Sequence, residues 1–168
     1  MIRSIVVLIE IIISYLLQSS VFSYFELAGV VPDILLILVV STAFFRGQKA
    51  GMLTGFLAGL LMDLCMGDVV GICAIFYMLI GFLNGYSNKI FDREDYLLPM
   101  ALITVSELLY NLLYYFFVVM LQGNLKFGYY FGKIILPRVV YTLFVAILFY
   151  KLFQMLHLML AHFENKER

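Results

Sequence analysis

The sequence predicts an all-α polytopic membrane protein, folded as a six-helix transmembrane bundle. Of the 168 residues, 64% are hydrophobic and only 13% are charged, and the mean hydropathy is +1.03. Soluble domains are about half apolar and about a quarter charged. A chain of this size cannot bury so much apolar surface in its own core, so the excess is expected to face lipid.

Six apolar runs divide the chain. A helix that spans a bilayer needs about 17–25 mostly apolar residues. Pro32 fits the first turn of the second run, where its missing amide hydrogen costs nothing. Because the connections are short and polar, we expect a single transmembrane domain over residues 1–168. The predicted helices are 5–22, 30–45, 50–66, 69–90, 97–121 and 134–160.

The first run is predicted to be a retained helix and not a cleaved signal peptide. The stretch Ile5–Phe22 is 18 residues long and contains Glu10 and Gln18. The apolar region of a signal peptide is shorter, about 7–15 residues, and further apolar runs follow here.

The distribution of basic residues predicts the orientation of the bundle. Cytoplasmic loops of membrane proteins are enriched in Lys and Arg. If the chain starts in the cytoplasm, eight basic residues fall inside and three, Lys126, Lys133 and Arg138, fall outside. Both termini are therefore expected in the cytoplasm. The inner eight are Arg3, Arg46, Lys49, Lys89, Arg93, Lys151, Lys166 and Arg168.

The sequence lacks the patterns of several enzyme and binding classes. Eleven basic residues balance eleven acidic ones, which is unlike the basic surface of a nucleic-acid binder. His157 and His162 are the only histidines, and no zinc-protease, nucleophile-elbow or phosphate-loop motif occurs. We therefore predict no catalytic residue, no metal and no cofactor. Cys65 and Cys73 flank one short turn; a disulfide is possible there, but small packing residues are the favoured interpretation.

Glycines recur every four residues along the third predicted helix. Residues four apart share a helix face, and small residues allow two membrane helices to approach closely. The ladder ends at Asp63, and a shorter glycine face occurs on the fourth helix. The pattern favours packing within the chain over packing on a partner helix. The glycines concerned are Gly47, Gly51, Gly55, Gly59, Gly81 and Gly85, with Gly67 and Gly71 continuing the spacing.

Ionisable and amide residues inside the apolar runs form a second signal. Such groups are costly in lipid and usually face the interior of a bundle. They predict either interhelical hydrogen bonds, the favoured interpretation, or a polar pocket. Asp63 and Arg138 fall at similar depth near the outer side and are expected to pair, with Asp33 as a competitor. The intramembrane polar residues are Glu10, Asp33, Asp63, Glu107, Asn111 and Arg138, and Ser14, Gln18 and Thr104 lie on the same stripes.

These features together resemble the family of the rod-shape-determining protein MreD. The resemblance is carried by Leu17-Gln18, by Pro32-Asp33 and by the motif that begins at Gly51 and Gly55-Phe56 and continues through Gly59, Asp63-Leu64, Gly67 and Gly71. It is anchored in residues 17–85, and the remainder agrees in length and hydropathy.

The resemblance implies a non-enzymatic component of the bacterial cell-wall elongation machinery, located in the plasma (inner) membrane. Its implied partners are an MreC-like membrane protein and, through it, MreB, RodA and a penicillin-binding transpeptidase. One of the glycine faces would receive the partner's membrane helix. The resemblance also implies a fold similar to the substrate-binding subunits of energy-coupling-factor transporters.

Two other functions stay open on the sequence. A transport subunit would need an outward-opening polar pocket, which Asp33, Asp63, Asp68 and Arg138 could line. A lipid-modifying enzyme is weakly suggested by Gly59 and Asp63, which resemble part of a phosphatidyltransferase motif. That motif continues with an aspartate where this chain has Gly67, so it is disfavoured.

Overall fold

The computed structural model describes residues 2–26, 29–66, 70–89, 97–123 and 125–166, and all regular structure in them is helical. The first helix comprises α1 (Ile2–Leu16), a π-helical turn (Leu17–Val21) and α2 (Phe22–Tyr24). The predicted all-helical architecture with six helices is confirmed for the described residues. The other five are α3 (Ile34–Arg46), α4 (Gln48–Met66), α5 (Ile72–Gly85), α6 (Leu97–Tyr114) with the π turn Tyr115–Val119, and α7 (Phe127–Tyr130) joined by the π turn Phe131–Ile135 to α8 (Leu136–Lys166).

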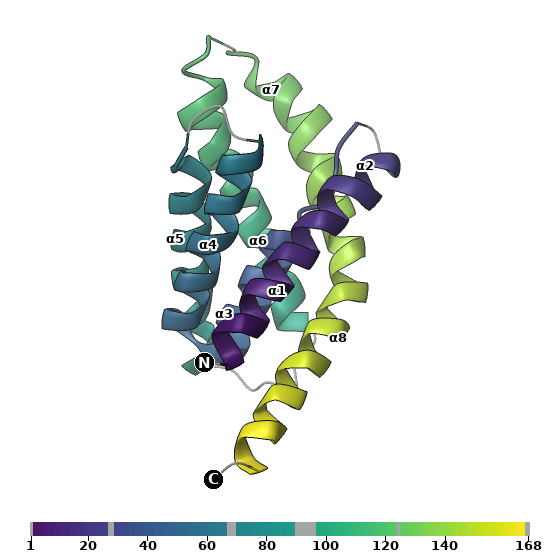
Figure 1. Cartoon of the computed structure of the whole chain (residues 1–168). Helices are drawn as coiled ribbons and strands as arrows, with labels where there is room; N and C mark the ends of the chain where they lie inside the picture. Colours follow the sequence, from purple (N-terminus) through teal and green to yellow (C-terminus); the bar gives the residue numbers. More distant parts are fainter. Residues whose placement is uncertain (1, 27–28, 67–69, 90–96, 124, 167–168) are drawn as a thin grey trace.

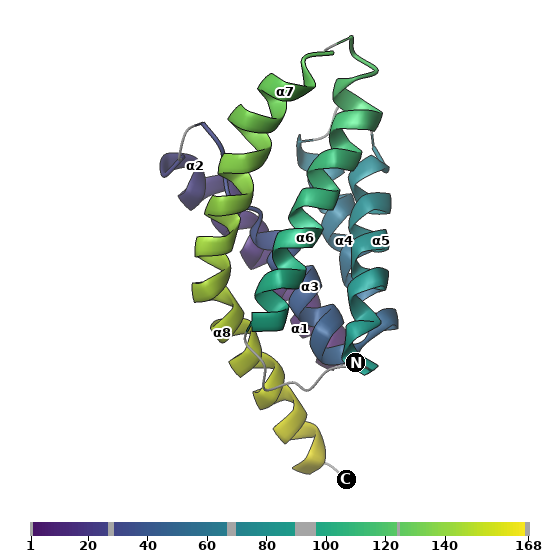
Figure 2. The same ribbon diagram turned by 180° about the vertical axis from the view of Figure 1, so that it is seen from behind.

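The helices run up and down between two ends of an elongated bundle (Figure 1). Both chain termini lie at one end, which we call the terminal end. The α2 segment and the connection between α6 and α7 lie at the opposite end, the distal end (Figures 1 and 2).

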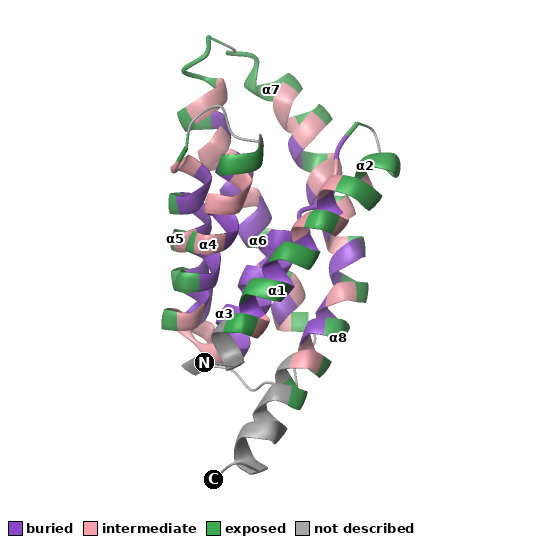
Figure 3. Cartoon of the chain, in the orientation of Figure 1, coloured by how far each residue is buried: buried purple, intermediate pink, exposed green. Residues whose placement is uncertain are grey.

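Helix α3 forms the centre of the bundle and contacts each of the other five helices. Every residue from Ile34 to Phe45 is buried, whereas α1 and α8 expose many large apolar side chains on their outer faces (Figure 3). A helix that is apolar all round is expected in a core. The outer faces of α1 and α8 are correspondingly suited to lipid.

Three of the helices are long and apolar enough to cross a membrane: Ile5–Tyr24, Leu97–Val119 and Phe127–Leu156. Two others, α3 and α5, are apolar but shorter. With 13 residues, α3 is about 20 Å long, against a hydrocarbon thickness of about 30 Å. The central helix therefore fills only part of the depth of the bundle.

Helix α3 begins four residues later than predicted, at Ile34 and not at residue 30. Residues 30–33 were expected to be helical, but they run as irregular chain from the distal end back into the bundle (Figure 1). Pro32 disfavours helical geometry at Val31. Asp33 then caps the helix, because its side chain accepts a hydrogen bond from the amide of Leu36 at 3.0 Å.

The last helix also differs from its prediction, since it begins at Phe127 and not at residue 134. Its π turn Phe131–Ile135 precedes Pro137, which has no amide hydrogen for the ordinary helical bond. A π turn is one of the recognised ways in which a helix accommodates such a break.

Candidate functional site: a charge cluster at the start of a buried helix

Backbone amides at the amino end of α3 donate hydrogen bonds to side chains from distant parts of the chain. Gln18 on the first helix accepts a hydrogen bond from the amide of Leu35 at 3.2 Å. Thr142 on α8 accepts one from the amide of Asp33 at 3.1 Å. Irregular backbone inside a membrane must find partners within the protein, because lipid offers none. These two side chains therefore fix the start of α3 between α1 and α8.

Arg138 binds two buried carboxylates beside this helix end. Its Nη2 lies 3.5 Å from Asp33 Oδ2, and its Nε lies 3.2 Å from Glu107 Oε1. The Tyr77 hydroxyl donates to Asp33, and Asn111 Nδ2 donates to Glu107 at 3.0 Å. We call Asp33, Tyr77, Glu107, Asn111 and Arg138 the Arg138 cluster. It connects the start of α3 with α5, α6 and α8.

Tyr110 extends the cluster on one side. The Arg138 guanidinium carbon lies 5.8 Å from the centre of the Tyr110 ring, within range of a cation–π contact. The Tyr110 hydroxyl is 3.5 Å from the Cys73 sulfur, and the two aromatic rings of Tyr77 and Tyr110 meet edge to face.

The expected pairing of Asp63 with Arg138 is wrong, and Asp33, the predicted competitor, pairs with Arg138. Asp63 instead caps α5. Its carboxylate accepts hydrogen bonds from the amides of Gly71 at 2.9 Å, Cys73 at 3.1 Å and Ala74 at 2.9 Å. A carboxylate is favourable at the positive end of a helix, and three amides satisfy it fully. Asp63 thus closes the turn between α4 and α5.

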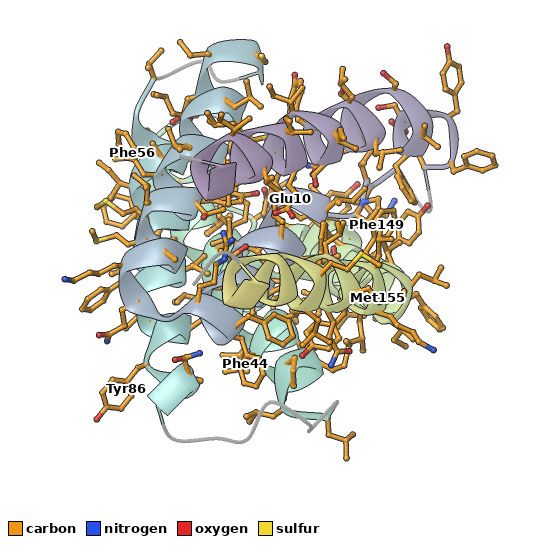
Figure 4. The ribbon with its side chains drawn as sticks, turned by 60° about the horizontal axis from the view of Figure 1, so that its bottom comes forward. Glu10, Phe44, Phe56, Tyr86, Phe149 and Met155 are labelled. Atoms are coloured by element: carbon orange, nitrogen blue, oxygen red, sulfur yellow. The ribbon has the colours of Figure 1, made fainter. Side chains whose placement is uncertain are left out.

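The remaining polar stripes lie where interior packing would put them. Glu10, Ser14 and Gln18 are all buried on one face of α1. Glu10 lies on the side of α1 that faces the bundle (Figure 4), and neither of its carboxylate oxygens has a hydrogen-bond partner among the described residues. Thr104 donates to the carbonyl of Met100 on its own helix. Both cysteines are free.

The predicted glycine ladder packs α4 against α5. A Cβ atom added to Gly51 would lie 2.5 Å from the Cβ of Ala43 and 2.6 Å from the carbonyl oxygen of Gly81. Added Cβ atoms at Gly55 and Gly59 would overlap the backbone at Tyr77 and Cys73, and those at Gly81 and Gly85 would overlap α4. We call the contact between these five glycines and the facing helix the glycine seam. The two glycine faces lie against helices of the same chain, which leaves no room there for a partner's helix.

Gly47, the first glycine of the predicted ladder, lies at the turn between α3 and α4. Gly47 ends α3 with a φ of +87°, a conformation that favours glycine, and its backbone carbonyl carbon would lie 2.8 Å from a Cβ added to Gly85. Met62, on α4, is partly buried against the core. Gly67 and Asp68 lie outside the described residues.

A cavity of ≈ 340 Å³ reaches the Arg138 cluster, since Arg138 is one of its lining residues. Of the four residues expected to line a polar pocket, Arg138 lines this cavity, whereas Asp33 and Asp63 are buried and do not. Gln18, Tyr110 and Tyr114 also line it, and its margin includes the exposed Ser23 and Gly29. The cavity therefore extends from an exposed edge to the guanidinium.

The comparison with protein families identifies the chain. The family model of the rod shape-determining protein MreD matches residues 1–160 of the 168. The chain belongs to the MreD family. It is thus a rod-shape-determining membrane protein. No curated protein and no solved structure matched it. The fold similarity to energy-coupling-factor subunits expected for this MreD-family chain is accordingly unsupported.

Several residues of the site in this MreD-family protein could not be predicted from the sequence. Tyr77 and Thr142 bind the start of α3, but a lone hydroxyl in an apolar run is common and carries no signal of its own. The stripe of Glu107 and Asn111 did indicate an inward face, and both residues belong to the Arg138 cluster.

Proposed function

We propose that this protein is a non-enzymatic integral membrane scaffold of the cell-wall elongation complex and that it holds an MreC-like membrane protein. The family match over residues 1–160 is the observation that carries the proposal. Through the MreC-like protein it would act beside MreB, RodA and a penicillin-binding transpeptidase. In this proposal it makes and breaks no covalent bond.

We expect a partner's helix to bind an outer face of the bundle. The glycine seam is occupied by α4 and α5, so the contact must use an outer face. Large apolar side chains are exposed on α1 and α8, for example Ile12, Leu16, Phe144 and Leu148. In lipid, helices associate through van der Waals packing and interhelical hydrogen bonds, so the contact is expected to depend on shape.

The proposed topology follows from the arrangement of the ends. Both termini lie at the terminal end (Figures 1 and 2), as six crossings require. The excess of Lys and Arg in loops at that end supports a cytoplasmic location for it. The distal end, with the mouth of the cavity, would then face away from the cytoplasm.

Depletion of the protein in its native rod-shaped cell tests the function. We expect cells to round up before they lyse, because lateral wall synthesis loses its membrane organiser. Re-expression of the intact chain should restore rods. Cells that stay rod-shaped through complete depletion, in a species with no second copy, would contradict the proposal.

A second candidate is the substrate-binding subunit of a small-molecule transporter of the energy-coupling-factor type. The cavity that reaches Arg138 is the observation that favours it. This candidate predicts normal cell shape after depletion together with the loss of uptake of a vitamin or another metabolite. The same depletion experiment therefore separates the two.

A further inference from the structure

The cavity exists because α3 begins deep inside the bundle. Helix α3 fills the centre only from Ile34 onward, and the segment before it descends along one side. The remaining space lies between α1, α4, α6 and the last helix. The residues that shape it include Gln18, Val31, Met62, Tyr114, Ile134 and Arg138.

Two of the three π-helical turns border this space, and the third begins directly beside it. Gln18 belongs to the turn Leu17–Val21, Ile134 belongs to the turn Phe131–Ile135, and Tyr114 directly precedes the turn Tyr115–Val119. All three residues line the cavity. π turns occur often at functional sites, where the extra residue redirects a side chain. Two π turns in the wall of one cavity, with a third beginning next to it, indicate a shaped site.

Arg138 presents the charge that reaches the cavity. Its side chain is 22% exposed, whereas Asp33 and Glu107 are 0% exposed. Both carboxylates therefore lie behind the guanidinium, and a molecule in the cavity would meet the positive member of the cluster first.

The amino end of α3 is already occupied by side chains of this protein. Gln18 and Asp33 accept hydrogen bonds from the amides of Leu35 and Leu36, so an anion in the cavity is left with Arg138. In this protein Asp33, at the amino end of α3, binds Arg138. The remaining walls, from Val31, Met62 and Ile134, are apolar, and the phenol of Tyr114 is amphipathic.

We propose that this cavity binds one anionic group, a carboxylate or a phosphate, against Arg138, with an attached apolar portion against Val31, Met62 and Ile134. A planar guanidinium suits both anions, because its N–H donors match pairs of their oxygens. A volume of ≈ 340 Å³ is near the lower limit of about 300–1,000 Å³ for ligand pockets. The occupant is therefore a small molecule or the headgroup of one phospholipid.

The test uses one variant that fills the cavity and one matched control. Val31→Phe places a ring in the cavity and leaves the Arg138 cluster intact. Val140→Phe makes the same change at an exposed position of α8. Arg138→Gln would remove the charge itself, but it could prevent folding, so the conclusion rests on the valine pair.

Two measurements separate the sources of the anion. In phospholipid-free detergent, phenyl phosphate and benzoate are titrated while thermal unfolding is followed, with benzyl alcohol as the neutral probe. The protein is also placed in nanodiscs of phosphatidylglycerol and phosphatidylcholine. Native mass spectrometry then counts the phospholipids that stay bound after the protein is released from the nanodisc. A small-molecule site gives a saturable rise in Tm with the two anions, and a lipid site gives one retained phospholipid.

In either case we expect the signal in the native chain and in Val140→Phe, and its loss in Val31→Phe. Two results would overturn the proposal: no binding in either measurement, or binding that Val31→Phe retains. A response to benzyl alcohol equal to that of benzoate would also overturn it, because it would show an apolar cavity without anion recognition. None of these outcomes depends on whether the protein binds an MreC-like partner.

Discussion

Arg138 on α8 binds Glu107 on α6 through a contact of 3.2 Å between Nε and Oε1, at a point where the neighbouring helix α3 has just begun. Asp33 completes the arrangement from the start of α3. A charge at this depth is expensive unless it is paired, so the contact has to form when the helices assemble. The cluster therefore fixes how deep α3 lies between its neighbours.

The first prediction concerns the partners of Arg138. Arg138→Gln should destabilise the protein by about 3–5 kcal/mol, because it leaves buried carboxylates without a counter-ion. Adding Glu107→Gln should recover part of the lost stability, because it removes one of the carboxylates that Arg138→Gln leaves unpaired. The amount of folded protein in membranes, measured by fluorescence-detected size-exclusion chromatography, checks this. Asp63→Asn serves as the control second mutation, and its effect should simply add to that of Arg138→Gln.

The second prediction concerns Asp63 as the cap of α5. Asp63→Ala removes three hydrogen bonds and should cost roughly 1–2 kcal/mol, in the range of strong helix caps. Asp63→Asn keeps one acceptor oxygen and should cost less. Thermal unfolding in detergent ranks the variants. If reversing the charges of Asp63 and Arg138 together restored stability, the cap would not be the role of Asp63.

The third prediction concerns the glycine seam. Gly55→Leu should abolish accumulation of the protein, because even a Cβ at this position overlaps the backbone of α5. Leu53→Phe, at an exposed position on the same helix, is the control and should accumulate normally. If Gly55→Leu accumulated normally but no longer captured a partner, the seam would instead be an interface with that partner.

The fourth prediction concerns topology. Reporter fusions after Phe25 and Asn124 should report the outside, and fusions after Lys49, Asp92 and Arg168 should report the cytoplasm. The reason is the excess of basic residues in the loops of the terminal end. An external signal at Lys49 or Arg168 would contradict the model. Asp92 lies outside the described residues, so its fusion tests the loop independently of the structure.

The sequence predicted the number and order of the helices, because apolar runs can be located from hydropathy alone, but the bounds of α3, α5 and the last helix differ from the prediction. The glycine spacing also predicted a close approach of helices, and a short turn makes α4 and α5 the natural pair. The partner of Arg138 could not be obtained in this way. Hydropathy placed residues 30–33 in a helix, whereas Pro32 and Asp33 start α3 deeper in the bundle. Depth along the bundle depends on tertiary contacts such as Gln18 to Leu35, which lie far apart in the sequence.

The most direct test of the scaffold proposal is to identify what the intact protein holds in its own membrane. The tagged chain would be purified in mild detergent from native cells, and the co-purified proteins would be quantified by mass spectrometry, with Gly55→Leu as a non-accumulating control. The proposal predicts an MreC-like protein in stable ratio to the chain, together with elongation enzymes. Recovery of transporter ATPases without any MreC-like protein would contradict it.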